Sequence, residues 1–409
     1  MIKEKYISKI KETSVNVVQT KIDSIRRKDI RKTGYRIYKD KLIGCAGAIG
    51  KHNQKELEKR AINALNNNIK YPYEISKNIK ISEDYSGEFN EERIINEFEK
   101  LLSDIRNQQP GFSFSHKLNL IEKENILTND NGVDLRYKDK YIQLELVIKD
   151  KSSSNLMDGF ISYVGREYDN KKILNEVNEF CNAFNNKVEL PKNKKLPVIF
   201  STGEQLPMMK FLKDLHGHSF GSKSSLLSEK LNKKVFNDKF TLYQNRNPKE
   251  TMEPFFDAEG VVNDGYVYTL IENGKILTSY TDKKTSKLYN LPLTGSAGAE
   301  YDGVPSLGMA NLKIKESEKT AKELLQGELG ILVVIAAGGD FTPEGNFATP
   351  VQLAFLYDGE KLIGRLPELK IASNVFYMFG DSFVGVSKDT VSTLSNDKCL
   401  IMNMEVSEI

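Results

Sequence analysis

The sequence predicts an α+β protein with two domains, a mixed α/β N-terminal domain over residues 1–190 and a β-rich C-terminal domain over residues 196–409. Its 409 residues exceed what a single core usually organises, at about 100 to 200 residues per domain. Helical and alternating apolar patterns are mixed in the first half, whereas hairpin signals dominate the second. The segment 190–197, LPKNKKLP, combines two prolines with a run of lysines and predicts the boundary between the domains.

The N-terminal domain is expected to combine helices with short strands. Apolar residues at helical spacing predict helices over Lys3–Glu12, Glu56–Leu65, Ile94–Ile105 and Lys171–Phe184. Alternation and β-branched residues predict strands over Val15–Gln19, Ile22–Ile25, Tyr35–Tyr38, Leu42–Ala46, Tyr141–Ile148 and Gly159–Val164. Asp40-Lys41 and the NDNG segment at 129–132 are expected as turns, and the polar residues 70–90 as a connector.

The C-terminal domain is expected to open with a strand over Val198–Ser201. A helix follows, with Pro207 in its first turn and apolar residues through Leu215. Hairpins are predicted at Asn273-Gly274 and at Asp358-Gly359, and the apolar run within 327–339 is typical of a buried strand.

Composition excludes several classes of protein. The 59 basic and 56 acidic residues leave a net charge of +3, so the sequence shows no general attraction to nucleic acid or anionic membranes. Three scattered cysteines predict neither a disulfide framework nor a Cys-rich zinc module, and favour a reducing, cytoplasmic location. We expect no membrane-spanning segment, because the longest apolar run is far shorter than the roughly 18 residues required. With four histidines, any metal site must use few ligands.

Two histidines lie in the segment Lys213-Asp214-Leu215-His216-Gly217-His218. On a strand, His216 and His218 would point to one face and could chelate zinc. The apolar spacing upstream predicts a helix instead, where residues two apart diverge by roughly 200°, so only a break at Gly217 could bring the rings together. The alternatives are a metal site and a helix end with surface or capping histidines.

Three further segments carry residue types suited to a site. In FFDAEGVV (255–262), Asp257 and Glu259 could hold a metal or transfer protons, although an acidic turn is the simpler interpretation. The loop with Gly295 and Gly298, followed by Asn311, could admit a peptide or phosphate, or could be a mobile crossover. Gly338 and Gly339 end a buried strand, and could form the rim of a groove that pairs with an extended peptide.

A basic cluster, Arg26-Arg27-Lys28 with Arg31-Lys32, is interrupted by acidic residues and lacks an adjacent aromatic side chain before Tyr35. This pattern favours a solvated surface over nucleic-acid binding.

Taken together, the motifs resemble the TldD/PmbA family, whose members are described as modulators of DNA gyrase and as zinc-peptidase-like proteins. The resemblance rests on the order of the Thr33-Gly34-Tyr35-Arg36 step, the Gly217-His218 helix end, FFDAEGVV, the LIENGKIL hairpin (270–277), TGSAG (294–298) and Gly338-Gly339. It implies an α/β N-terminal domain and a β-rich C-terminal domain.

The resemblance also implies a branch of this family. TldD-like members carry HExxxH and a cysteine from the C-terminal region, whereas PmbA/TldE-like members lack the metal motif and pair with a TldD-like subunit. Here Lys213 takes the place of the first histidine, Asp214 that of the glutamate, and His218 that of the second histidine. A protonated lysine has no lone pair for zinc. Cys399 lies in a predicted strand, so the pattern favours the PmbA/TldE-like branch, with Lys213, Asp214 and His218 as a degenerate site.

The leading hypothesis is a subunit without zinc or another cofactor that helps a TldD-like zinc peptidase to process small or unfolded peptides. Its partner would be that subunit or a second copy of itself. Gly295, Gly298, Asn311, Gly338 and Gly339 would line the peptide groove. One alternative is a metallopeptidase with a zinc site rebuilt around His216 and His218. Another is a modulator that acts on DNA or gyrase, which the low net charge disfavours. The sequence leaves hydrolytic activity of its own undecided.

Overall fold

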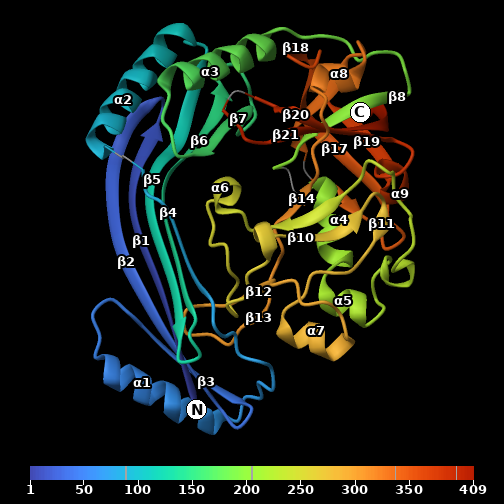
Figure 1. The fold of residues 1–409 in the computed structure, drawn as a ribbon. Coiled ribbons are helices and arrows are strands. Elements are labelled where there is room, and N and C mark those ends of the chain that lie inside the picture. Colours follow the sequence, from blue (N-terminus) through green and yellow to red (C-terminus); the bar gives the residue numbers. More distant parts are fainter. Residues whose placement is uncertain (88–89, 204–205, 337, 393) are drawn as a thin grey trace.

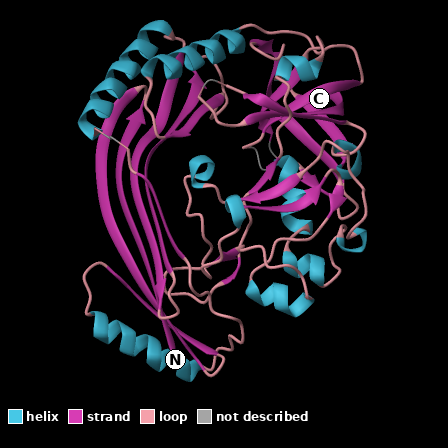
Figure 2. Ribbon diagram, viewed as in Figure 1, coloured by secondary structure: helices cyan, strands magenta, loops and turns pink. Residues whose placement is uncertain are grey.

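A long curved sheet with helices at its two ends faces a second, strand-rich region across the molecule in the computed structural model (Figure 1). The structure describes residues 1–87, 90–203, 206–336, 338–392 and 394–409. Figure 2 shows that strands dominate both regions, that the longer helices lie on the outside of the long sheet, and that short helices lie between the two regions. The α+β class is confirmed. Within the described residues, no helix is long and apolar enough to cross a membrane.

The N-terminal region is built on one seven-stranded sheet. Its strands are β1 (Ile2–Val18), β2 (Lys21–Lys39), β3 (Leu42–Ile49), β4 (Lys80–Tyr85), β5 (Phe112–Asn129), β6 (Asp134–Asp150) and β7 (Gly159–Gly165). The order is β3-β2-β1-β5-β6-β4, and β7 pairs with a further stretch of β6. All neighbours are antiparallel except β4 and β6, which run parallel.

Three helices cover parts of this sheet, namely α1 (Gln54–Asn63), α2 (Glu91–Gln108) and α3 (Asn170–Asn185). Each begins after a residue whose side chain accepts backbone N–H groups of the first turn: Asn53, Asn90 and Asp169. The apolar faces of α2 and α3 pack with the sheet into one core that includes Phe98, Phe180 and Leu118. The helices predicted over 56–65, 94–105 and 171–184 are therefore confirmed.

The helix predicted over Lys3–Glu12 is wrong, because these residues belong to β1. This strand pairs along nearly its whole length with β2 on one side and β5 on the other. Such long-range pairing outweighs a local pattern of charged and apolar residues that also suits a helix. The short strands predicted at 15–19, 22–25 and 35–38 are likewise parts of the two long strands β1 and β2. The 70–90 connector also contains β4, which the sequence analysis missed.

The C-terminal region contains the remaining strands of the described residues. They are β8 (Lys195–Ser201), β9 (Leu242–Asn245), β10 (Val267–Glu272), β11 (Lys275–Ile276), β12 (Ala297–Gly298), β13 (Ser306–Leu307), β14 (Leu312–Ile314), β15 (Gly330–Ala336), β16 (Asp340–Phe341), β17 (Asn346–Tyr357), β18 (Leu362–Arg365), β19 (Leu369–Asn374), β20 (Phe383–Thr390) and β21 (Lys398–Glu408). Eight of them form one sheet: six follow the path β15-β8-β21-β19-β17-β16, β18 pairs with β17, and β20 pairs with β21. Because β15 pairs with β17 as well as with β8, this path closes into a ring.

Short helices connect the C-terminal strands. They are α4 (Met209–Asp214), α5 (Gly217–Gly221), α6 (Pro248–Thr251), α7 (Lys283–Tyr289), α8 (Ala321–Leu325) and α9 (Val375–Met378). Single 3-10 turns occur at η1 (Ala64–Asn67), η2 (Leu206–Met208), η3 (Ser228–Lys230) and η4 (Asp264–Tyr266). A smaller sheet with the order β11-β10-β9-β14 lies beside the ring (Figure 1).

The turn signals of the sequence were reliable. Asp40 and Lys41 join β2 to β3 with φ of 52° and 63°, and Asn273 and Gly274 join β10 to β11 with φ of 46° and 78°. Both turns have the positive φ values of tight hairpins. The buried strand predicted within 327–339 is β15, although Ala337 lies outside the described residues.

Candidate functional site

The segment 213–218 lies where two short helices meet. Helix α4 ends at Asp214, α5 begins at Gly217, and His216 between them has an extended backbone with φ of −65° and ψ of 121°. The backbone N–H of Tyr280 donates to the carbonyl oxygen of Leu215 at 2.9 Å. A Cβ atom on Gly217 would lie 2.7 Å from the Tyr280 carbonyl oxygen, so a glycine is needed for this close approach. The break in the helix is therefore produced by the chain segment at Tyr280.

Asp214 is a buried structural residue. Its carboxylate pairs with the ammonium group of Lys210 at 3.1 Å, and both side chains are about 95% buried. It also accepts the backbone N–H of Leu226 at 3.1 Å. The Lys210 ammonium donates further to the carbonyl oxygens of Thr342 and Pro343. Asp214 and Lys210 together therefore join α4 to Leu226 and to residues 342–343, and the Asp214 carboxylate faces the core.

The other polar residues of the segment differ in how far they are exposed to solvent. Lys213 and His218 are exposed, whereas His216 is half-buried. The His216 ring stands edge-on to Tyr280 with 5.5 Å between ring centres, and burial lowers its pKa. The Nδ1 atom of His218 is hydrogen-bonded to the Tyr289 hydroxyl at 2.8 Å. Each histidine therefore has its own aromatic neighbour.

These donors do not fit a zinc site. A protein zinc site uses three or four protein ligands, and the described residues contain no group of three or more His, Cys, Asp or Glu side chains able to hold a metal ion. Cys399 lies within β21 and is fully buried, and burial raises the pKa of its thiol to about 12. A thiol ligand must be deprotonated, which this environment opposes. Lys213 offers no lone pair while it is protonated.

The FFDAEGVV segment forms a turn. Asp257 accepts the backbone N–H groups of Glu259 and Val261 through one oxygen, both at 2.9 Å. Its other oxygen accepts the N–H of Ala297 at 3.0 Å. Gly260 has φ of 69°, which favours glycine. Of the two interpretations that the sequence allowed, the structure therefore has the acidic turn, and the turn holds the loop at 297.

Glu259 connects this turn to the N-terminal region. Its carboxylate accepts the Tyr71 hydroxyl at 2.6 Å and the backbone N–H of Lys283 at 2.9 Å. Burial, together with the nearby charge of Asp257, raises the pKa of Glu259 to about 7. A carboxyl group that titrates near neutral pH therefore lies within the contact between the two regions.

Arg36 strengthens the same contact. Its guanidinium group, 2% exposed, pairs with Glu4 at 3.1 Å and donates to the carbonyl oxygen of Ala258. Gly34, two residues earlier, lies against the backbone of Tyr301, where a Cβ atom would clash. The segment Thr33–Arg36 therefore packs against the C-terminal loops at Ala258 and Tyr301.

Two of the predicted groove residues lie in a loop held by buried contacts. The carbonyl oxygen of Gly295 accepts the Gln244 amide and the Arg246 guanidinium group, both at 3.0 Å. Gly298 pairs with Ser306 between β12 and β13. Gly295 and Gly298 are not among the residues that line the cavity described next.

Asn311 lines a cavity of about 750 Å³, called here the central cavity. Its walls come from α4, α6, β14 and residues 396–398. Strand β14 pairs with β9 on one side and is an edge of its sheet. The carbonyl oxygen of Asn311 accepts the N–H of Asn245 in β9, and the N–H of Lys315 donates to Thr241 just before β9. By alternation, the main-chain groups of Leu312 and Ile314 point away from β9. Leu312 lines the central cavity, whereas Ile314 is buried in the core, so the wall of the cavity contains the edge of β14 at Leu312.

Gly338 and Gly339 lie elsewhere, between β15 and β16, and do not line the central cavity. A Cβ atom on Gly339 would lie 2.3 Å from that of Thr349, so this glycine allows close packing against β17. Of the five residues predicted to form a groove, the structure therefore brings only Asn311 to the central cavity.

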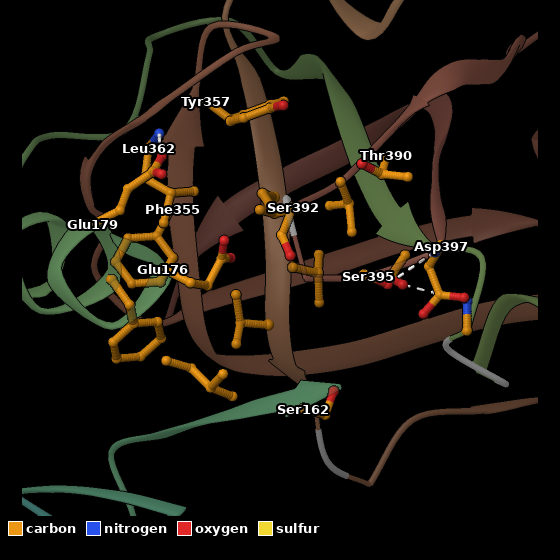
Figure 3. A pocket seen from close by; sticks show the side chains of 18 of the residues that line it. Ser162, Glu176, Glu179, Phe355, Tyr357, Leu362, Thr390, Ser392, Ser395 and Asp397 are labelled. Carbon is orange, nitrogen blue, oxygen red and sulfur yellow. Dashed lines mark hydrogen bonds between the residues drawn. The ribbon is translucent and has the colours of Figure 1, made fainter. Parts of the chain in front are cut away.

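A second cavity of about 460 Å³, called here the junction cavity, lies between the two regions (Figure 3). Helix α3 and β7 supply one side, including Glu176 and Glu179. The closed sheet, with residues 389–392, Ser395 and Asp397, supplies the other. Asp397 lies opposite the two glutamates in Figure 3. The junction and central cavities share Gly203 and Asp397, so they adjoin.

The sequence analysis missed the junction cavity and the contacts of Glu4, Arg36 and Tyr71. Each is made by residues far apart in the chain, and no local spacing marks them. Of these contacts, the sequence pointed only to the segment Thr33–Arg36. That this segment packs against the C-terminal region follows from the contacts of Gly34 and Arg36.

Comparison with known families gives a match to the C-terminal region. The sequence profile described as "PmbA/TldA metallopeptidase C-terminal domain" matches residues 193–407, more than half of the 409 residues. The search of curated proteins gives no match.

Solved structures resemble the whole chain. TldE from Thermococcus kodakarensis is 21% identical, with a TM-score of 0.77, over 100% of this chain and 95% of that chain. A protein from Thermotoga maritima, described as a candidate modulator of a DNA gyrase, is 18% identical, with a TM-score of 0.79, over 99% and 96%. One from Bacteroides thetaiotaomicron with a similar description is 17% identical, with a TM-score of 0.78, over 100% and 95%. At these identities the likeness shows a shared fold.

Proposed function

Because the chain belongs to the PmbA/TldD family, we propose that it is a peptide-binding, peptidase-like subunit of the PmbA/TldE-like branch. It holds small or unfolded peptides and assists a TldD-like subunit that supplies the zinc and the hydrolytic step. The likeness to the Thermococcus TldE fold supports this branch. The proposed location is the cytoplasm, where the three free cysteines would stay reduced.

The use of Asp214 carries the proposal. In an active relative this position would hold the glutamate of HExxxH, a residue that must face substrate or water to move a proton. Here the carboxylate is turned into the core, paired with Lys210 and bonded to Leu226. Freeing it would leave the Lys210 ammonium buried without its partner, which is costly. The chain therefore supports a structural role for this residue and leaves catalysis to a partner.

Peptide binding is supported by the open edge of β14 in the central cavity. An extended peptide can add to a strand edge through main-chain hydrogen bonds. Such bonds do not depend on the peptide's side chains, so they suit varied, unfolded sequences. Leu312 supplies the outward main-chain groups in the cavity wall, and Asn311 lies beside it. The side chains of Met208 and Leu212 give the cavity a partly apolar wall.

One experiment separates this proposal from a metallopeptidase with a zinc site rebuilt at His216 and His218. The pure chain is exposed to zinc, desalted and assayed for metal and for hydrolysis of a fluorogenic peptide, alone and with a TldD-like subunit that has an intact HExxxH. We expect hydrolysis only in the mixture and no stoichiometric zinc on the chain alone. Stoichiometric zinc that His218→Ala removes, together with hydrolysis by the chain alone, would establish the alternative.

A second experiment tests the strand edge. Leu312→Pro removes one outward N–H, and Leu312→Ala keeps that N–H while shortening the side chain. We expect the proline variant to lose most peptide affinity in a fluorescence anisotropy titration and the alanine variant to keep most of it. Circular dichroism spectra and thermal midpoints of both variants show whether each is folded. Equal affinity of two folded variants would exclude the β14 edge as the binding element.

A further inference from the structure

We propose that the junction cavity binds the basic side chain of a peptide whose main chain lies in the central cavity, so that this subunit selects peptides with arginine or lysine at one position. The inference rests on the proposed function, since it names a class of peptide for the same site. Three features of the junction cavity support it: its negative charge, its apolar wall and its position next to the central cavity.

The charge of the junction cavity has one sign. No lysine, arginine or histidine is among its described lining residues. Five carboxylates line it: Glu176, Glu179, Glu360, Asp389 and Asp397. Glu360 pairs with Lys322 at 3.0 Å. Within the described part of the chain, Glu179, Asp389 and Asp397 form no ion pair with a basic side chain. The cavity therefore has a surplus of negative charge.

The hydrogen bonds of Glu179 and Asp389 leave the charges of these two carboxylates in place. Glu179 accepts the backbone N–H of Leu362 at 3.1 Å, and Asp389 accepts that of Ala321 at 2.8 Å. Backbone N–H groups orient a carboxylate without neutralising it. Glu179 and Asp397 stand on opposite sides of the cavity in Figure 3. A cation between them would gain from both.

The remaining wall suits the apolar stem of a basic side chain. Phe160, Phe180, Phe355 and Tyr357 line it. Lysine and arginine stems bury their methylene groups against such surfaces, and aromatic faces attract the cationic head. Tyr357 is 3% exposed, and its hydroxyl is a hydrogen-bond partner of the Cys399 thiol. In Figure 3 this hydroxyl lies across the cavity toward Thr390. A guanidinium or ammonium group could donate to it.

The position of the cavity indicates that the cation is carried by a peptide. The junction and central cavities share Gly203 and Asp397. A peptide on the β14 edge could therefore place one side chain past Asp397 into the junction cavity while its main chain stays in the central cavity. The volume of about 460 Å³ is ample for an arginine side chain and its water.

The test compares peptides that differ at a single position. Fluorescein-labelled hexapeptides with arginine, lysine, citrulline or norleucine, placed in turn at each position of an alanine-rich sequence, are titrated with the full chain by anisotropy. Citrulline keeps the shape of arginine and removes its charge. At one position we expect arginine and lysine to bind roughly tenfold or more tightly than citrulline and norleucine, as charge-assisted hydrogen bonds usually provide.

Charge-removing variants locate the preference. Asp397→Asn and Glu179→Gln keep the size of each side chain, and each should reduce the ratio of arginine to citrulline affinity several-fold. Glu328→Gln removes one charge from an exposed residue outside the cavity and should leave the ratio unchanged. Thermal midpoints within a few degrees of the wild-type value confirm that the variants are folded.

The outcomes separate this inference from the proposed function. If arginine and citrulline peptides bind equally well, the inference is overturned while peptide binding stands. If no peptide binds but spermidine or arginine amide binds by calorimetry and Asp397→Asn abolishes it, the cavity takes free cations, and both the peptide source and the proposed function fail. If all three charge variants lower the ratio equally, the preference is a general charge effect and the cavity is excluded.

Discussion

Segment 213–218 and the junction cavity both contain acidic side chains, but they use them differently. Asp214 is paired with Lys210 and bonded to Leu226, so its charge serves the fold. Asp397 and Glu179 face a cavity that has no basic lining residue among those described. Asp214, which stands at a position of the family motif, is thus structural. The carboxylates of the junction cavity belong to no motif, and their charge is available for a ligand. The predictions below test this contrast from the largest expected effect to the smallest.

Removing Asp214 should have the largest effect. Asp214→Ala leaves the buried Lys210 ammonium without its partner, and we expect the free energy of unfolding to fall by about 3–5 kcal/mol. Urea denaturation at pH 7 measures the change. The double variant Lys210→Met with Asp214→Leu removes both charges and should recover much of the loss. A loss below about 1 kcal/mol for the single variant would mean that Asp214 is available for another role.

Glu259 should make stability depend on pH. Its folded-state pKa is raised to about 7 from an ordinary 4.5, so the folded protein retains a proton that the unfolded chain loses between these values. Stability should therefore be greatest below about pH 4.5, fall by roughly 2–3 kcal/mol as the pH rises to about 7, and stay level above it as far as this group is concerned.

The control for this effect is Glu259→Gln, which cannot titrate; its one amide oxygen can accept the Lys283 N–H, and its NH2 group can donate to the Tyr71 hydroxyl oxygen. Unfolding free energies of both proteins are measured by urea denaturation at intervals from pH 4.5 to 8. The difference between wild type and variant should change across this window with the stated sign. A constant difference would show that Glu259 titrates normally.

Removing the charge of Asp397 should change stability little. No ion pair within the described residues depends on its carboxylate, so Asp397→Asn should alter the free energy of unfolding by no more than about 0.5 kcal/mol. Peptide affinity, measured on the same preparation, should fall for the arginine peptide. A stability loss comparable to that of Asp214→Ala would remove the contrast between the two regions.

Restoring the first histidine of the family motif should have the smallest effect. Lys213 is exposed, so Lys213→His should leave the fold intact. Asp214 and Cys399 would remain buried, and His218 would keep its contact with Tyr289. We therefore expect zinc content to remain below one ion per chain by mass spectrometry. A full equivalent of zinc in this variant would show that the segment can rearrange into a metal site.

The sequence predicted the parts of the fold whose signals are local. Asn273-Gly274 and Asp40-Lys41 determine their own turns, and the helices at 94–105 and 171–184 carry a clear apolar stripe. Residues 3–12 form a strand because β2 and β5 lie on either side of them, which no local pattern reveals.

The candidate site followed the same rule. The acidic turn at 257–260 was foreseen as one alternative, since its hydrogen bonds lie within a few residues. The junction cavity could not be foreseen, because Glu179 and Asp397 meet only through the packing of α3 against the closed sheet. Asp214 and Lys210 lie one helical turn apart, so their spacing is visible in the sequence. The burial of both side chains is not, and it is the burial that makes this ion pair structural.

Peptide affinity measured with and without a chelator tests the central claim most directly. An arginine-containing peptide is titrated with the wild-type chain by anisotropy, first in buffer with zinc and then in excess EDTA. The account predicts the same dissociation constant in both, because binding uses the β14 edge and the carboxylates of the junction cavity. Loss of binding in EDTA, restored by zinc, would contradict it.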